Sequence, residues 1–189
     1  NVYTGNLSAV IGGTTGAAWG INAQSTSNAS DANADEIVIN TFGTVSGRQG
    51  ILAINSGKDL GGAGVGDTID IQTSQASATV TSSDGDGIRA TGAAGNIRVA
   101  VNSNVTATGT TQSANGIKAS SSLGGNIDVQ VANNSKTVSN GATGADGVNA
   151  ATTGGGNIAV RILNSNANGQ ITGATDGIDT SVTGSNGTT

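Results

Sequence analysis

A repeat of about thirty residues runs through most of this 189-residue chain and limits the folds that it can adopt. Its first element is a glycine followed by Ile or Val, any residue, and then Ala or Thr. Six copies begin at Gly20, Gly50, Gly87, Gly116, Gly147 and Gly177, with successive glycines 30, 37, 29, 31 and 30 residues apart. Such nearly regular intervals indicate a solenoid, in which each repeat forms one coil.

Two further elements recur between the copies of the first. One reads Ile-x-Val or Ile-x-Ile and begins at Ile37, Ile69, Ile97, Ile127 and Ile158. The other is a single aliphatic residue between polar residues, at Val45, Val80, Val105, Val138 and Ile171. Apolar and polar residues alternate in these elements, which is typical of strands with one buried face. None of them shows the spacing of an amphipathic helix.

Short strands of this kind cannot bury an apolar face alone, but they can when each stacks on its copy one repeat later. The sequence therefore predicts an all-β fold, a right-handed single-stranded parallel β-helix with three short strands per coil. About thirty residues per coil give five to six coils over residues 1–189, which form a single solenoid. We expect regular coils over 20–182, an N-terminal coil or cap over 1–19, and a loose tail over 183–189.

Polar residues mark the predicted corners between strands. Asp or Asn precedes the anchoring glycine in the last four repeats, a combination that tolerates positive φ and turns the chain sharply. These residues are Asp86, Asn115, Asp146 and Asp176. Before the second strand, three equivalent asparagines are predicted to form a ladder in which each side chain bonds the next coil. These are Asn96, Asn126 and Asn157. The longest interval contains Gly57–Gly62, which we expect to be a corner loop.

The composition excludes several kinds of site. The chain has no Cys and no His, so it cannot form a Ser-His-Asp triad or a thiolate or imidazole metal site. A net charge of −5 and seven dispersed basic residues argue against nucleic acid and anionic membranes as partners. No apolar stretch is long enough for a membrane helix, and no signal peptide follows Asn1. We therefore expect a processed product or an excised fragment.

Acidic residues are the remaining candidates for chemistry. Asp67 with Asp70, or Asp84 with Asp86, could act as the paired carboxylates of a sugar-cleaving enzyme, but the three aromatic residues lie far away, near the N-terminus. The turn around Asp84 and Asp86 also resembles a calcium loop, although Gly95 stands where an EF-hand needs Glu. An Asp-rich turn is the favoured interpretation. The run Gly61–Asp67 is interpreted as a flexible corner loop, and no cofactor is predicted.

Residues at the outward positions of the predicted strands indicate which side chains the solenoid exposes on its faces. The strand of the third element carries hydroxyl columns, and the predicted contact face comprises Thr79, Thr81, Thr106, Thr137, Ser139 and Thr172. Such columns resemble the face of an ice-binding solenoid, but β-branched propensity alone also favours them; glycosylation of the hydroxyls is a further alternative. In the second strand, Asp70, Arg98 and Asp128 are predicted to pair along one column. Arg89 beside Lys118 forms a small basic spot that an acidic glycan could contact, although solvated surface also explains it.

The order Asp-Gly-Ile-x-Ala, Gly-Asn-Ile-x-Val and Val-Thr resembles the passenger domains of Gram-negative bacterial autotransporters, above all the Gly-, Asn-, Ser- and Thr-rich adhesin type. The resemblance covers roughly residues 20–182 and rests on the repeat rather than on a catalytic signature. It implies a β-helix that is exported through the outer membrane and displayed at the cell surface. Any link to the membrane would run through a translocator barrel that this sequence lacks.

The resulting hypothesis is a non-catalytic, structural and adhesive segment on the outside of a bacterial cell. It would make multivalent contacts with a host-cell or matrix ligand or glycan, or with copies of itself. A carbohydrate-active β-helix, either a polysaccharide lyase or a hydrolase, is the alternative, and an ice-binding solenoid is the third hypothesis. Strand edges at the coil ends are predicted to favour end-to-end association.

Overall fold

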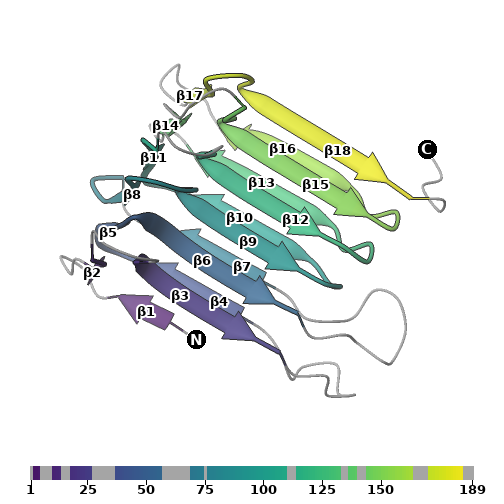
Figure 1. Ribbon diagram of the computed structural model, residues 1–189, viewed down its shortest axis with the longest axis horizontal. Coiled ribbons are helices and arrows are strands. Elements are labelled where there is room, and N and C mark those ends of the chain that lie inside the picture. The colour runs from purple at the N-terminus through teal and green to yellow at the C-terminus, as the bar shows by residue number, and fades with distance from the viewer. Residues whose placement is uncertain are drawn as a thin grey trace.

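The computed structural model describes residues 2–4, 10–13, 18–26, 37–56, 69–74, 76–109, 114–132, 136–139, 144–163 and 170–184. Side chains are described in these ranges except at 2–4 and 136–139. The described chain contains strands and no helix. Its strands form three parallel sheets of six strands each (Figure 1). The predicted all-β class and parallel solenoid are confirmed.

Each coil contributes one strand to each sheet, so hydrogen-bonded neighbours are about one repeat apart in the sequence. Sheet A contains β1 (Val2–Thr4), β4 (Ile37–Thr41), β7 (Ile69–Thr73), β10 (Ile97–Val101), β13 (Ile127–Ala132) and β16 (Ile158–Leu163). Sheet B contains β2 (Val10–Ile11), β5 (Val45–Gly47), β8 (Thr79–Ser82), β11 (Asn104–Ala107), β14 (Lys136–Ser139) and β17 (Gln170–Thr172). Sheet C contains β3 (Trp19–Ser25), β6 (Gln49–Asn55), β9 (Ile88–Gly92), β12 (Ile117–Ser121), β15 (Val148–Thr153) and β18 (Ile178–Thr183).

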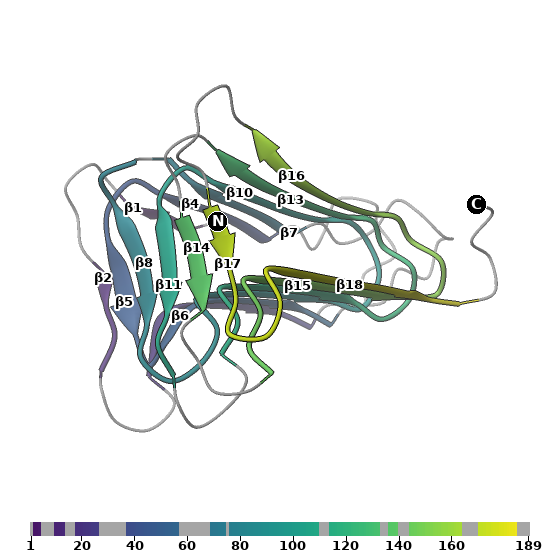
Figure 2. The same ribbon diagram turned by 90° about the horizontal axis from the view of Figure 1, so that it is seen from above.

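The three sheets enclose a roughly triangular cross-section (Figure 2). That view looks down on the C-terminal coil, in which the chain passes anticlockwise through β16, β17 and β18. Because successive coils advance toward the viewer, the solenoid is right-handed.

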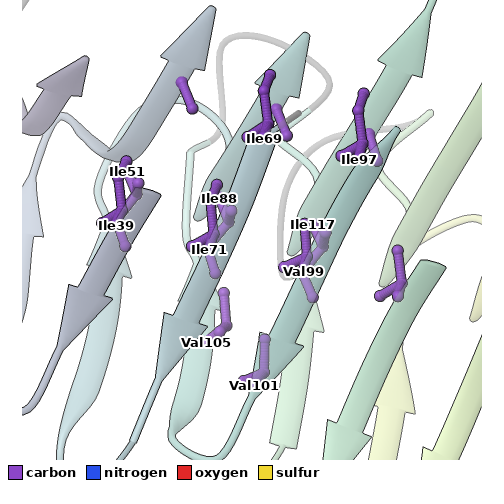
Figure 3. Close-up of a cluster of buried hydrophobic side chains, with 14 of the residues drawn as sticks. Ile39, Ile51, Ile69, Ile71, Ile88, Ile97, Val99, Val101, Val105 and Ile117 are labelled. Atoms are coloured by element: carbon purple, nitrogen blue, oxygen red, sulfur yellow. The ribbon is translucent and has the colours of Figure 1, made fainter. Parts of the chain in front are cut away.

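Aliphatic side chains from successive coils form rows inside this triangle. In sheet A, the strand register places Ile97, Ile127 and Ile158 in one interior row, as predicted. Ile97 and Ile127 are each only 1% exposed. Equivalent rows line the other two sheets, and Figure 3 shows the middle of this core. They include Val80 and Val105 in sheet B and Ile51, Ile88 and Ile117 in sheet C. Burial of these rows is the main contribution to the stability of the fold.

The number of complete turns is smaller than the predicted five to six. Each sheet has six strands, but only the four inner strands of each sheet have a neighbour on both sides. About four turns are therefore packed from above and below. The prediction counted every copy of the repeat as a coil, whereas a terminal copy lacks the second neighbour that closes its interior.

The C-terminal end of the solenoid is open. Ile162 in β16 is 46% exposed, and Ile178 and Val182 in β18 are 44% and 52% exposed. These three residues lie at inward register positions, next to buried residues of the preceding coil. By contrast, Ile21 is only 6% exposed, although it lies in β3, the outer strand at the opposite end of sheet C from β18. In the predicted tail, residues 185–189 lie outside the described residues, as does the predicted loop Gly57–Gly62.

Candidate functional site

Acidic and amide side chains at the corner between sheets B and C form a ladder along the solenoid. Oδ1 of Asp86 accepts hydrogen bonds from the backbone N and from Nδ2 of Asn115, at 2.9 and 3.0 Å. Oδ1 of Asn115 accepts one from the backbone N of Asp146 at 2.9 Å, and Oδ1 of Asp146 accepts one from the N of Asp176 at 3.3 Å. Asp86, Asn115 and Asp146 are buried. The ladder thus ties four coils together at one corner.

Burial sets the protonation behaviour of the first ladder residue. Desolvation raises the pKa of Asp86 above its usual value of 3.8. The hydrogen bonds from Asn115 and the nearby charges of Lys118 and Arg89 lower that pKa, but they do not cancel the effect of burial. The carboxyl group of Asp86 is therefore a buried structural acceptor.

The glycines that follow this ladder serve close packing, which corrects one sequence interpretation. The Asp-Gly pairs were expected to supply positive φ, but neither Gly87 nor Gly147 has a positive φ. A Cβ atom on Gly87 would lie 2.6 Å from Cγ1 of Val105 and 2.7 Å from the carbonyl oxygen of Gly116. Gly87 and Gly147 are required because the backbone of the next coil passes directly beside each of them.

A second ladder runs along the corner between sheets C and A. Oδ1 of Asn96 accepts a hydrogen bond from the backbone N of Asn126 at 3.1 Å. Oδ1 of Asn126 accepts the equivalent bond from the N of Asn157 at 2.9 Å. These asparagines are exposed, and they satisfy backbone donors at the start of successive strands.

The carboxylates considered for catalysis or calcium binding have separate structural partners. Asp84 forms an ion pair with Arg48, whereas Asp86 is bound to Asn115 on the next coil. Asp70 is hydrogen-bonded to Arg98, and its suggested partner Asp67 lies outside the described residues, with the rest of Gly61–Asp67. Within the described part of the chain, no group of three or more acidic residues is arranged to hold a metal ion.

The predicted charge column on the outer face of sheet A is present, but its pairing differs. The register aligns Asp70, Arg98 and Asp128 on successive strands. Arg98 Nη1 lies 3.0 Å from Oδ1 of Asp70. Asp128 instead pairs with Arg161, whose Nη2 lies 3.0 Å from its Oδ1, because Ala159 occupies the next position in the column. These side chains are partly exposed, so each pair contributes about 0–1 kcal/mol.

The predicted hydroxyl face on sheet B is interrupted. Thr81 and Thr106 lie side by side in the outward column, and Thr79 lies beside Asn104. At β14, however, Thr137 aligns with the buried Val105 instead of Asn104. Ser139 aligns with the buried Ala107, and Val138 takes the position between Thr106 and Thr172.

Relative to the prediction, the backbone register of β14 is displaced by one residue. The side chains of β14 lie outside the described ones. The ice-binding hypothesis requires a continuous column of hydroxyl residues. The register interrupts this column at β14, where Val138 stands between Thr106 and Thr172.

The outer face of sheet C carries the basic spot noted in the sequence. Arg89 on β9 and Lys118 on β12 occupy paired register positions. Two residues further along the same strands, Oγ of Ser120 donates a hydrogen bond to Oγ1 of Thr91 at 3.3 Å. All four side chains are partly exposed. The structure thus brings two cations and two hydroxyl groups together on one face, which adds Thr91 and Ser120 to the basic spot predicted from the sequence.

Comparisons with protein-family models, curated proteins and solved structures gave no match to this chain. Among the residues that the structure describes, no helix has the length and apolar character needed to cross a membrane.

Proposed function

We propose that this chain is a structural, adhesive segment displayed at a bacterial cell surface, where the polar outer faces of its solenoid contact host-cell or matrix ligands. The observation that carries the proposal is the repetition of outward polar side chains in register, on a scaffold whose core is aliphatic. Neighbouring strands are about 4.8 Å apart, so each outward position recurs at that interval along the solenoid.

Such a surface would act through many weak contacts. Strand register and the two corner ladders hold the backbone of the outward positions in place, so little backbone conformational entropy is lost on binding. Each contact contributes little, but several contacts to one ligand surface raise the effective concentration of the next. Display of many copies on a cell would amplify this effect further.

The repeat pattern supports the proposed location and the non-catalytic role. The motifs that resemble autotransporter passengers are the same motifs that build the corners, with Asp86 and Asn115 in one ladder and Asn96 and Asn126 in the other. Asp84 and Asp86, one of the two carboxylate pairs considered for catalysis, are each engaged by a structural partner. The proposal therefore assigns the polar surface, and no catalytic centre, to function.

A density-controlled adhesion assay tests the proposal. The purified chain is coupled to beads at low and high density, and bead attachment to cultured epithelial cells and to extracellular matrix is measured. We expect attachment that rises steeply with density, because avidity dominates. A lack of attachment at every density would contradict the adhesive role.

A second experiment tests the location. Antibodies against the chain should label intact cells of the bacterium that encodes it, and labelling only after cell lysis would contradict surface display.

A further inference from the structure

Two basic side chains on sheet C differ from the other described arginines. Arg48, Arg98 and Arg161 each form an ion pair with an aspartate. Arg89 and Lys118 have no carboxylate within ion-pair distance among the residues that the structure describes. They nevertheless lie on adjacent strands at paired positions. Their strands are about 4.8 Å apart, and like charges at directly opposite positions repel each other. The buried carboxyl group of Asp86 attracts both cations but forms an ion pair with neither.

The packing holds one of these cations against the sheet. The Nε atom of Arg89 is buried and has no hydrogen-bond partner. Leu52, the neighbour of Arg89 on the adjacent strand, occupies an outward register position but is only 2% exposed. The Arg89 side chain therefore lies along the protein surface, where part of its hydrogen-bonding capacity is unused.

Hydroxyl groups complete the surface beside the two cations. Thr91 and Ser120 follow Arg89 and Lys118 by two residues on the same outward face, so they lie about 7 Å further along the strands. We name the four residues Arg89, Lys118, Thr91 and Ser120 the cationic patch. A planar guanidinium binds a carboxylate through two parallel hydrogen bonds, an ammonium group adds a point charge, and hydroxyl groups bond with sugar hydroxyls.

We infer that the cationic patch binds the carboxylate group of an acidic saccharide. This inference rests on the proposed adhesive function and names a class of ligand for it. A phosphate polymer fits less well, because the chain carries a net charge of −5 and the patch has two cations only. One carboxylate group of a saccharide needs no more than one such pair, and the neutral hydroxyls of its sugars match Thr91 and Ser120.

The surroundings of the patch restrict how the ligand lies. In the column that contains Arg89 and Lys118, the next two coils present Asn149 and then Asp179. Nδ2 of Asn149 donates hydrogen bonds to Oδ2 of Asp146 at 2.9 Å and to Oδ2 of Asp179 at 3.0 Å. These carboxylates would repel an acidic chain that extends along the solenoid axis toward the C-terminal coil. The saccharide therefore does not extend from the patch toward the C-terminal coil, whereas the two hydroxyl groups along the strands remain open to it.

Titration of the purified chain with defined oligosaccharides tests this inference. The probes are an oligouronate, the same oligosaccharide with its carboxyl groups reduced to alcohols, and a sulfated oligosaccharide of equal length. Binding is followed by isothermal titration calorimetry and by amide shifts in NMR spectra. We expect the oligouronate to bind and to shift amides of β9 and β12, and the reduced form to bind at least about tenfold more weakly. Tighter binding of the sulfated probe would overturn the assignment to carboxylate.

Single substitutions distinguish binding at the cationic patch from a general effect of positive charge on the protein. Arg89→Gln and Lys118→Gln remove one cation each, and each should weaken oligouronate binding about tenfold. Arg161→Gln removes the same charge from sheet A and should change binding less than twofold. An equal loss in Arg161→Gln, or no binding by the unmodified chain, would overturn the inference. If Arg89→Gln does not fold, judged by circular dichroism, Lys118→Gln decides the question alone.

The titration and the bead assay together separate this inference from the broader proposal. If the unmodified chain does not bind oligouronate but its beads adhere to cells or matrix, the saccharide assignment is wrong and the adhesive function stands. If the unmodified chain binds oligouronate but its beads adhere to no cell or matrix surface, the patch is a binding site and the adhesive function is wrong.

Discussion

Asp86 and Asn115, 29 residues apart in the sequence, are joined by two hydrogen bonds to a single carboxylate oxygen. Both residues are buried, at 6% and 2% exposure, so neither group of Asn115 has water as an alternative partner. Single hydrogen bonds from the backbone N of Asp146 and of Asp176 continue the ladder over the next two coils. The ladder therefore accounts for polar residues at a corner that is closed to solvent.

Asp86→Ala should lower the free energy of unfolding by about 1–3 kcal/mol, because it leaves buried donors of Asn115 without an acceptor. Urea denaturation followed by circular dichroism measures the change. Asp84→Ala is the matched control, since it removes a partly exposed carboxylate two residues away and should cost about 0–1 kcal/mol. Equal losses of unfolding free energy in the two variants would show that the ladder contributes no more stability than the ion pair of Asp84.

Stability should depend on pH through Asp86 in the direction opposite to that of an ion-paired aspartate. Burial raises the pKa of Asp86 above 3.8, so the folded state binds the proton more tightly than the unfolded state. The resulting stabilisation is complete below pH 3.8 and is lost as the pH rises through the raised pKa. Asp86→Asn, which cannot titrate, should therefore gain stability relative to the wild type between pH 4 and pH 7. A constant difference across that range would contradict the raised pKa.

Gly87→Ala should destabilise the solenoid by about 1–3 kcal/mol, because the new methyl group would overlap Val105 and the backbone of Gly116. Gly92→Ala provides the comparison within the same strand region, since its Cβ would meet no atom closer than 3.5 Å. We expect Gly92→Ala to be neutral or slightly stabilising, because alanine restricts the unfolded chain. Thermal unfolding of the two variants in parallel checks the contrast, which equal melting temperatures would refute.

Ile127→Ala should cost about 2–5 kcal/mol, because Ile127 lies 1% exposed between Ile97 and Ile158 in the interior row. Ile178→Ala removes the same atoms from the terminal coil, where the side chain is 44% exposed, and should cost less. Chemical denaturation gives both values. A larger loss at Ile178 would mean that the C-terminal coil is covered in solution.

The open C-terminal coil should cause the chain to self-associate. Ile162 and Val182 are exposed at inward positions, and β16, β17 and β18 are edge strands. Ile162→Lys combined with Val182→Lys should reduce association in light scattering at high protein concentration. Ser83→Lys combined with Ser122→Lys adds the same charge to exposed corners of inner coils and should leave association unchanged. An unmodified chain that stays monomeric at high concentration would contradict this prediction.

The register of individual strands was less predictable than the repeat. Motif similarity aligned Val138 with Val105, whereas the structure aligns Thr137 with that residue. Likewise, the column of outward charges was predicted correctly, but Asp128 pairs with Arg161 from a neighbouring column. Both outcomes are contacts between neighbouring coils, which the repeat pattern alone does not specify.

The amino-acid sequence by itself determined the solenoid, its thirty-residue coil, its three strands per coil and the inward rows of Ile and Val. Evenly spaced aliphatic residues on short alternating strands have one efficient means of burial, which is to stack on their own copies. Only the tertiary structure decided why Gly87 must be glycine, which oxygen of Asp86 binds Asn115, and which cations lack a partner. These features are contacts between residues about thirty positions apart, and angstrom-scale differences in the path of each corner determine them.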